Sequence, residues 1–168
     1  MATRYHTATA AFEQTLEQLD LPNGSLDADE QVEIGRRGAL LATAMLQWEE
    51  HLGPLLDWRK VATLMGTVST RQGVNDLAKR NRLLALRTKG GHVLYPLFQF
   101  RGAKPFPELP TLLEVLDAGS LDGWSIASWF VTGQPLLGDE SPAGWLKAGR
   151  DPAQVFEAAE RVAERLAH

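Results

Sequence analysis

Residues 58–100 read WRKVATLMGTVSTRQGVNDLAKRNRLLALRTKGGHVLYPLFQF, and this stretch decides the fold of the chain. Two short helical patterns are joined by a turn that contains Gly66. Two strand-like runs follow, with Lys89-Gly90-Gly91 between them. Two helices followed by a hairpin are the order of elements in a helix-turn-helix with a β-wing. The sequence therefore predicts a winged helix-turn-helix at the centre of the chain.

The second of these helices is predicted to expose a polar face. Ser69 or Thr70 is placed to cap its first N–H groups, and Val74 and Leu77 have the spacing of an inward face. The outer face then holds side chains of the types that contact phosphates and base edges. Together with two cations beside the tip of the wing, the predicted DNA contacts are Thr70, Arg71, Gln72, Asn75, Lys79, Arg87 and Lys89.

Charge is distributed unevenly along the sequence. Residues 57–104 hold ten Lys and Arg against two Asp and Glu, a net charge of +8, whereas the rest of the chain carries −12. Phosphate binding depends on local charge, so a basic block within an acidic protein favours contact with nucleic acid. The alternative is that these cations form the solvated surface of a packed helix pair, since helix-turn-helix patterns also occur in unrelated helical folds.

The composition of the 168 residues, 44% apolar and 23% charged, is typical of a globular protein with one or two domains. The chain has no cysteine, which excludes disulfides, thiolate metal ligands and a cysteine nucleophile. No run approaches the ~20 apolar residues of a membrane span, and the N-terminus lacks the apolar segment of a signal peptide. We therefore expect a cytoplasmic protein with no membrane contact.

Residues 1–56 are predicted to be helical and acidic, with one helix over residues 7–19 and a longer one over residues 26–51. The long helix carries two apolar rows, one of Val32, Gly35, Ala39, Ala42 and Leu46 and the other of Leu41, Met45, Trp48 and Leu52. So wide an apolar face either packs on both other parts of the chain or forms a dimer seam. We favour a dimer, because DNA readers of this kind often bind two half-sites.

The wing strands are expected over residues 83–88 and 92–98, and Pro96 is expected to end the sheet because proline cannot donate to a ladder. The aromatic residues of the segment YPLFQF, residues 95–100, are expected to anchor the wing to the helices. Stacking of these rings on bases is the alternative. Residues 101–110 are rich in Pro and Gly and form the predicted domain boundary.

Four short helices are predicted after this boundary, over residues 110–118, 123–131, 142–149 and 151–168. Ser141 is expected to cap the third and Asp151 the last, which is expected to bury Val155, Ala159, Val162 and Leu166. The predicted fold class is therefore mainly α. It consists of a helical region over residues 1–56, a winged helix-turn-helix over 57–104 and a small helical bundle over 105–168.

Several short motifs follow one another in the C-terminal sequence, namely Trp129-Phe130, Pro135-Leu136-Leu137-Gly138, Ser141-Pro142, and Gly149-Arg150-Asp151 followed by Val155. In this order they resemble the Xre/MbcA/ParS toxin-binding domain, over about residues 108–168. Several features depart from the family. Trp-Phe stands in place of Trp-Leu, Asp139 replaces a second glycine, and Trp145 occupies a position where smaller or aliphatic residues are common. The DNA-binding part also carries a wing and the segment YPLFQF.

The resemblance implies the antitoxin of a type II toxin–antitoxin pair. Its partner would be a RES-domain toxin that consumes NAD or uses it for ADP-ribosylation, and the DNA-binding part would repress the shared operon. Toxin contacts are then expected from Trp145, Lys147, Arg150, Arg161, Glu164, Arg165 and His168. Core packing is the alternative for the tryptophans; it is favoured for Trp124 and Trp129 and left open for Trp145. The alternative function is a stand-alone transcriptional regulator whose C-terminal bundle dimerises or senses a ligand.

No motif in the sequence predicts an enzyme. The four histidines, at positions 6, 51, 92 and 168, lack the spacing that places two metal ligands on one helical face. There is no Gly-rich phosphate loop after a strand and no Gly-x-Ser-x-Gly elbow. We therefore expect no catalytic activity, no metal and no cofactor. The expected partners are operator DNA, the toxin and a second copy of the chain.

Overall fold

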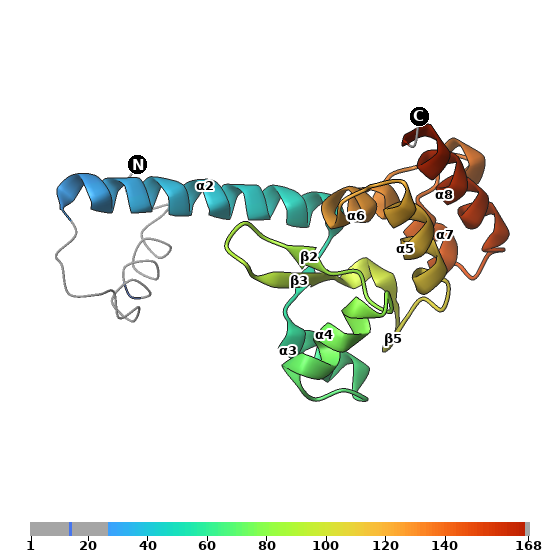
Figure 1. Ribbon diagram of the computed structural model, residues 1–168, viewed down its shortest axis with the longest axis horizontal. Coiled ribbons are helices and arrows are strands. Elements are labelled where there is room, and N and C mark those ends of the chain that lie inside the picture. The colour runs from blue at the N-terminus through green and yellow to red at the C-terminus, as the bar shows by residue number, and fades with distance from the viewer. Residues whose placement is uncertain (1–13, 15–26, 167–168) are drawn as a thin grey trace. The chain divides into compact units, whose positions relative to one another are not determined.

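Residue 14 and residues 27–166 are described by the computed structural model of the chain. They form helices and a small amount of antiparallel sheet, so the predicted mainly α fold class is confirmed (Figure 1). The chain divides into two compact units, residues 1–42 and residues 43–168. The helix predicted over residues 7–19 lies outside the described residues. Among the helices that are described, none has the length and apolar character needed to cross a bilayer.

Helix α2 (Ala28–Leu52) confirms the long helix predicted near the N-terminus. Its start is fixed by two reciprocal hydrogen bonds, from the Glu30 N–H to the Asp27 carboxylate and from the Asp27 N–H to the Glu30 carboxylate. In one of the two apolar rows, Met45, Trp48 and Leu52 pack in the core of residues 43–168. Leu46, from the other row, is 67% exposed. That other row stays a candidate dimer seam.

The next five elements are one strand that was not predicted and then the two helices and two strands of the predicted winged helix-turn-helix. They are β1 (Leu55–Leu56), α3 (Trp58–Met65), α4 (Arg71–Lys79), β2 (Leu86–Arg87) and β3 (Val93–Pro96). Strand β3 lies between β1 and β2 in an antiparallel sheet, where Leu56 pairs with Tyr95 and Leu86 with Leu94. The strands of the wing are shorter than expected, and β3 ends at Pro96 as predicted.

A compact turn region follows β3 and leads into the predicted domain boundary at residues 101–110. It contains η1 (Leu97–Gln99) and a second hairpin, β4 (Phe100–Arg101) and β5 (Lys104–Pro105). Gln99 is fully buried; its side-chain amide donates to the carbonyls of Leu84 and Pro96 and accepts from the Leu84 N–H. A buried amide needs such partners, because an unpaired polar group costs free energy there. These bonds hold the base of the wing against η1.

Four C-terminal helices confirm the predicted bundle. They are α5 (Leu109–Ala118), α6 (Gly123–Val131), α7 (Pro142–Lys147) and α8 (Ala153–Leu166), with η2 (Pro135–Leu137) before α7. Helices α5 and α8 meet closely at Gly119, where a Cβ would lie 2.9 Å from the Cα of Ala163. The prediction that Leu166 is buried is wrong. This residue lies in the last turn of α8, beyond that contact, and is 52% exposed.

The core of residues 43–168 extends across the predicted domain boundary. Leu84, Leu86 and Phe98, from the wing and the turn after it, are buried in one cluster with residues of the C-terminal helices. A smaller cluster lies inside the helix-turn-helix and consists of Val61, Val74, Leu83, Tyr95 and Phe100. The predicted boundary at residues 101–110 therefore falls within the compact unit of residues 43–168, and the β4–β5 hairpin lies at its start.

Candidate nucleic-acid interface

The turn between α3 and α4 sets how the two helices cross. Gly66 ends α3 in the left-handed region, at φ 66°, and its N–H donates to the Ala62 carbonyl. Thr70 then caps α4, since its hydroxyl oxygen accepts from the Gly73 N–H at 3.0 Å. Gly73 has to be small, because a Cβ there would lie 2.5 Å from a methyl group of Val68. Of the two residues predicted as caps, Thr70 is the one that caps the helix.

The outward face of α4 carries side chains that the sequence predicts as DNA contacts. Arg71, Gln72 and Lys79 are exposed, and Asn75 is half-buried. Thr70 is also exposed, but its hydroxyl is engaged as the helix cap. The structure thus brings two cations and two amides onto one helix at its exposed side.

Hydrogen bonds orient both of these amides. Gln72 donates from Nε2 to the Asp76 carboxylate at 2.8 Å, one turn further along α4. The hydroxyl of Tyr95, in β3, donates to Oδ1 of Asn75 at 3.1 Å. Burial raises the pKa of Tyr95 above its ordinary value, so the hydroxyl keeps its proton for this bond. The two bonds use the donor end of Gln72 and the acceptor end of Asn75.

The hairpin between β2 and β3 forms the predicted wing. Its turn is closed by the Thr88 N–H, which donates to the His92 carbonyl, and by the His92 N–H, which donates to the Thr88 hydroxyl oxygen. Gly91 adopts a φ of 79°, a conformation that favours glycine. Arg87 and Lys89 are exposed on this hairpin. The two cations predicted for the wing therefore lie exposed on its surface.

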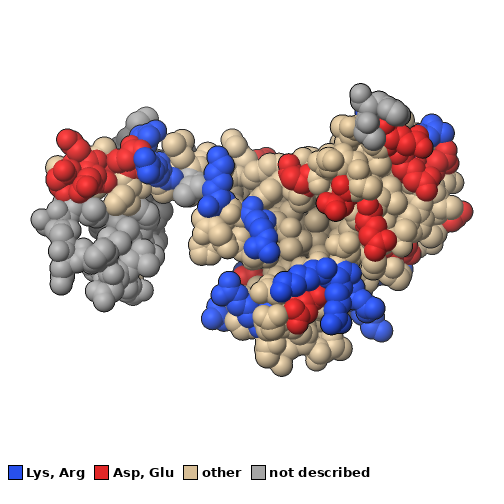
Figure 2. All heavy atoms as spheres, in the orientation of Figure 1, with Lys and Arg blue, Asp and Glu red and all other residues tan. Residues whose placement is uncertain are grey.

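Positive charge gathers on the helix-turn-helix and the wing. Figure 2 shows Lys and Arg side chains over α3 and α4 and along the β2–β3 hairpin, whereas Asp and Glu gather over the C-terminal helices. The exposed cations of this region are Arg59, Lys60, Arg71, Lys79, Arg80, Arg82, Arg87 and Lys89. The basic block of the sequence therefore becomes a basic surface, which attracts phosphate.

A groove of about 340 Å³ lies where the first turns of α3 and α4 meet β3. Arg59, Arg71 and His92 line it, one from each of α3, α4 and the wing. The guanidinium carbon of Arg59 lies 4.9 Å from the ring centroid of Trp58. Arg59 and His92 are not among the predicted DNA contacts. Arg59 could have been found from the sequence, because Arg59 and Lys60 stand together at the start of a helix, where anions are favoured.

The aromatic residues after the wing are buried. Tyr95, Phe98 and Phe100 are each no more than 6% exposed and lie in the two hydrophobic clusters. The expected anchoring role is confirmed. Stacking on bases, the alternative, requires exposed rings.

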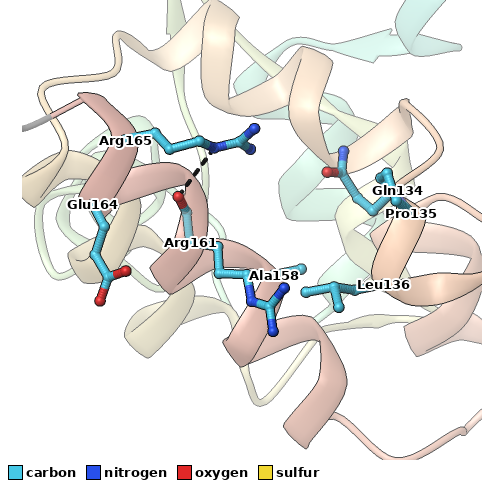
Figure 3. A pocket seen from close by; sticks show the side chains of 7 residues that line it. All are labelled: Gln134, Pro135, Leu136, Ala158, Arg161, Glu164 and Arg165. Carbon is cyan, nitrogen blue, oxygen red and sulfur yellow. Dashed lines mark hydrogen bonds between the residues drawn. The ribbon is translucent and has the colours of Figure 1, made fainter.

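A second groove, of about 370 Å³, lies on the C-terminal helices between η2 and α8 (Figure 3). Its lining residues are Gln134, Pro135, Leu136, Ala158, Arg161, Glu164 and Arg165. Arg161 extends from α8 toward Leu136 and forms an ion pair with Glu157 at 2.6 Å. Three of the residues expected to contact a toxin, Arg161, Glu164 and Arg165, therefore meet at one groove.

The other expected toxin contacts do not line this groove. Trp145 braces the end of α7: its indole N–H donates to the Asp151 carbonyl at 2.8 Å, and the guanidinium carbon of Arg150 lies 4.6 Å from its ring centroid. Trp145 is half-buried, and Lys147 is exposed on α7. His168 lies outside the described residues. Within the part of the chain that is described, no group of three acidic or histidine side chains is placed to hold a metal ion.

Comparison with solved structures gives a similarity in fold. No protein-family model matches the chain, and no curated protein matches it. The NMR structure of Rv2175c is similar to this chain, with a TM-score of 0.56 and 26% sequence identity. The similarity covers 66% of this chain and 81% of that one. The two proteins therefore share a fold over most of the length of that structure.

Proposed function

We propose that this protein is a DNA-binding regulator of transcription. Helix α4 enters the major groove of double-stranded DNA, and the wing contacts the phosphate backbone beside it. The observation that carries the proposal is that exposed cations line two grooves that both include Asn75 of α4: Arg59 and Arg71 line one, and Lys79 and Arg87 of the hairpin line the other. The major groove, roughly 12 Å wide, admits a helix, and cations on both sides of that helix then reach phosphates.

The proposed contacts divide by chemistry. Arg71 and Lys79, from opposite ends of α4, supply charge that releases counterions from the phosphate backbone. Gln72 and Asn75 carry amide groups that pair with base edges and so provide sequence preference. Arg87 extends the phosphate contacts to the wing.

The experiment begins with selection of the preferred site from a library of random duplexes. Fluorescence anisotropy on that site, at several salt concentrations, then gives affinity and salt dependence. Arg71→Ala and Lys79→Ala are each expected to weaken binding and to lower the slope of log K against log salt by about 0.9. Lys147→Ala, which removes an exposed cation on α7, is the matched control and leaves both quantities unchanged. If the unmodified protein binds no duplex even at low salt, the proposal is wrong.

An antitoxin is the second candidate, and the groove between η2 and α8 favours it. Three charged side chains expected from the toxin-binding resemblance lie at this groove. The partner would be a RES-domain toxin, bound by the C-terminal helices while the basic surface represses the operon. Both candidates share the DNA-binding surface, so they differ only in what the C-terminal helices bind.

Co-expression separates the two candidates. The tagged protein is produced with its untagged chromosomal neighbours and passed through gel filtration at high salt, which removes nucleic acid. An antitoxin retains a stoichiometric partner that is toxic when expressed alone. Arg161→Ala is expected to weaken that complex, whereas Arg71→Ala leaves it intact. A clean homodimer without a partner would exclude the antitoxin and leave the DNA-binding proposal standing.

A further inference from the structure

The first turn of α6 covers the free edge of the wing. Strand β2 pairs with β3 on one side only, and α6 contacts β2 (Figure 1). The indole N–H of Trp124 donates to the Arg87 carbonyl at 2.9 Å. A Cβ on Gly123 would lie 3.0 Å from the Ala85 carbonyl oxygen. Because backbone groups two residues apart point to the same side of a strand, one helix end covers both carbonyls of this edge.

Trp124 is held in place from a second direction. Its ring centroid lies 4.8 Å from that of Trp48, in α2. Helices α2 and α6 make a further contact, in which Nε2 of His51 lies 2.8 Å from the hydroxyl oxygen of Ser128. The indole donor therefore stands between α2 and the wing with little freedom to move.

The base of the wing is also part of the C-terminal core. Leu86, in β2, is fully buried in the same cluster as Ile126 and Ala127 of α6. Arg87 follows directly and is exposed, so the wing leaves the core at the peptide whose carbonyl Trp124 binds. The position of this peptide sets the direction of the hairpin beyond it.

We propose that α6 positions the wing for DNA and that Trp124 is the positioning residue. The inference rests on the proposed DNA-binding function. When the bond from Trp124 is lost, the hairpin moves about its base, and Arg87 and Lys89 no longer meet the phosphates beside the groove that α4 occupies. A partner that displaces α6 is thereby coupled to DNA affinity, although it touches no base.

The first test measures the wing in the free protein. Trp124→Phe removes the donor and keeps an aromatic ring. Trp129→Phe is the matched control, because within the described residues the buried Nε1 of Trp129 has no hydrogen-bond partner. Amide hydrogen exchange at Thr88 and His92 is expected to be about two- to tenfold faster in Trp124→Phe, the range that one hydrogen bond accounts for. Trp129→Phe leaves it unchanged, and unchanged exchange in Trp124→Phe as well would overturn the inference.

The second test measures DNA binding by the same variants. Trp124→Phe is expected to bind about two- to tenfold more weakly, and its salt slope is expected to fall by about 1 to 2 as the two wing cations lose their phosphates. A general loss of stability does not change that slope. Faster exchange with unchanged affinity and slope would overturn the coupling of the wing to DNA.

A second variant keeps the inference testable if Trp124→Phe does not fold. Gly123→Ala presses a methyl group toward the Ala85 carbonyl and is expected to displace the hairpin in both assays. If the unmodified protein binds no DNA, the proposed function fails by itself. The exchange data would still decide whether Trp124 holds the wing.

Discussion

The hydroxyl of Tyr95 reaches Oδ1 of Asn75 at 3.1 Å, so strand β3 and helix α4 share a hydrogen bond. Asn pairs with adenine through both ends of its amide, one accepting and one donating. Tyr95 occupies one of the two lone pairs of Oδ1, so under the proposed function the N–H₂ group of Asn75 is the end more open to a base. A residue of the wing strand therefore influences how the Asn75 amide is presented on α4.

Removal of this hydroxyl is predicted to change base preference. Tyr95→Phe frees Oδ1 of Asn75. At the position that Asn75 faces, adenine is therefore expected to be selected more often, relative to bases whose major-groove edge only accepts hydrogen bonds. Duplex selection with both proteins measures this, and Leu97→Ile, a change of similar size beside the strand, is the control. Identical selected sites for the unmodified protein and Tyr95→Phe would show that the hydrogen bond has no part in specificity.

Stability is predicted to depend on alkaline pH through the same residue. Burial raises the pKa of Tyr95, so the folded state binds this proton more tightly than the unfolded state. The contribution of this proton to the free energy of unfolding is fully present below the pKa that Tyr95 has in the unfolded chain, about 10. It is lost as pH rises above that value. Urea unfolding between pH 9 and 11, about the unfolded pKa, is expected to show a smaller decline for Tyr95→Phe. An equal decline in both proteins would contradict the assignment.

The cap of α4 is predicted to contribute to stability. Thr70→Ala leaves the Gly73 N–H without its acceptor and is expected to lower the free energy of unfolding by about 1 kcal/mol. Thr63→Ala, at an exposed position within α3, is the control and should change little. Chemical denaturation of the two variants measures the difference. A cost shared by both would point to loss of threonine itself instead of the cap.

Close packing of α5 on α8 is predicted to exclude a side chain at Gly119. A Cβ there would lie 2.9 Å from the backbone of Ala163, so Gly119→Ala forces the helices apart and is expected to cost about 1–3 kcal/mol. Gly35→Ala is the contrasting variant, since a Cβ in that part of α2 meets no described atom within 4 Å. It is expected to stabilise by about 1 kcal/mol through helix propensity. Because Gly35 belongs to the proposed dimer seam, both variants are measured at a concentration at which the protein is monomeric. Thermal unfolding distinguishes the two signs.

The exposed row of α2 is predicted to form a dimer seam. Leu46→Gln is expected to shift the protein from dimer to monomer, because Leu46 is 67% exposed and belongs to one predicted apolar row. Leu40→Gln is the control; Leu40 is 57% exposed and lies outside both rows. Light scattering coupled to gel filtration gives the mass of each. A monomeric unmodified protein would remove the dimer hypothesis.

The helices were predictable because their signals are local. Thr70 and Ser141 cap helices through their own side chains, and Gly66 ends α3 in the left-handed conformation that glycine allows. Such residues indicate where a helix begins or ends from the local sequence alone. The wing turn is local in the same sense, since Thr88 and His92 close it within five residues.

What could not be predicted depends on distant partners. Strand β1 has two residues, too few for an alternating pattern, and it is a strand only because Leu55 pairs with Pro96. Gln99 looked like an ordinary polar residue, yet it is buried because Leu84 satisfies its amide. Arg59 joins the basic groove only once α3, α4 and β3 are assembled.

The covered edge of β2 also affects how the protein behaves at high concentration. An open strand edge invites pairing with strands of other molecules, which leads to aggregation. Here α6 covers the carbonyls of Ala85 and Arg87, and β1 at the opposite side of the sheet offers two residues. Neither edge is a good template for a foreign strand. The helix that aims the wing thus also shields the sheet from intermolecular pairing.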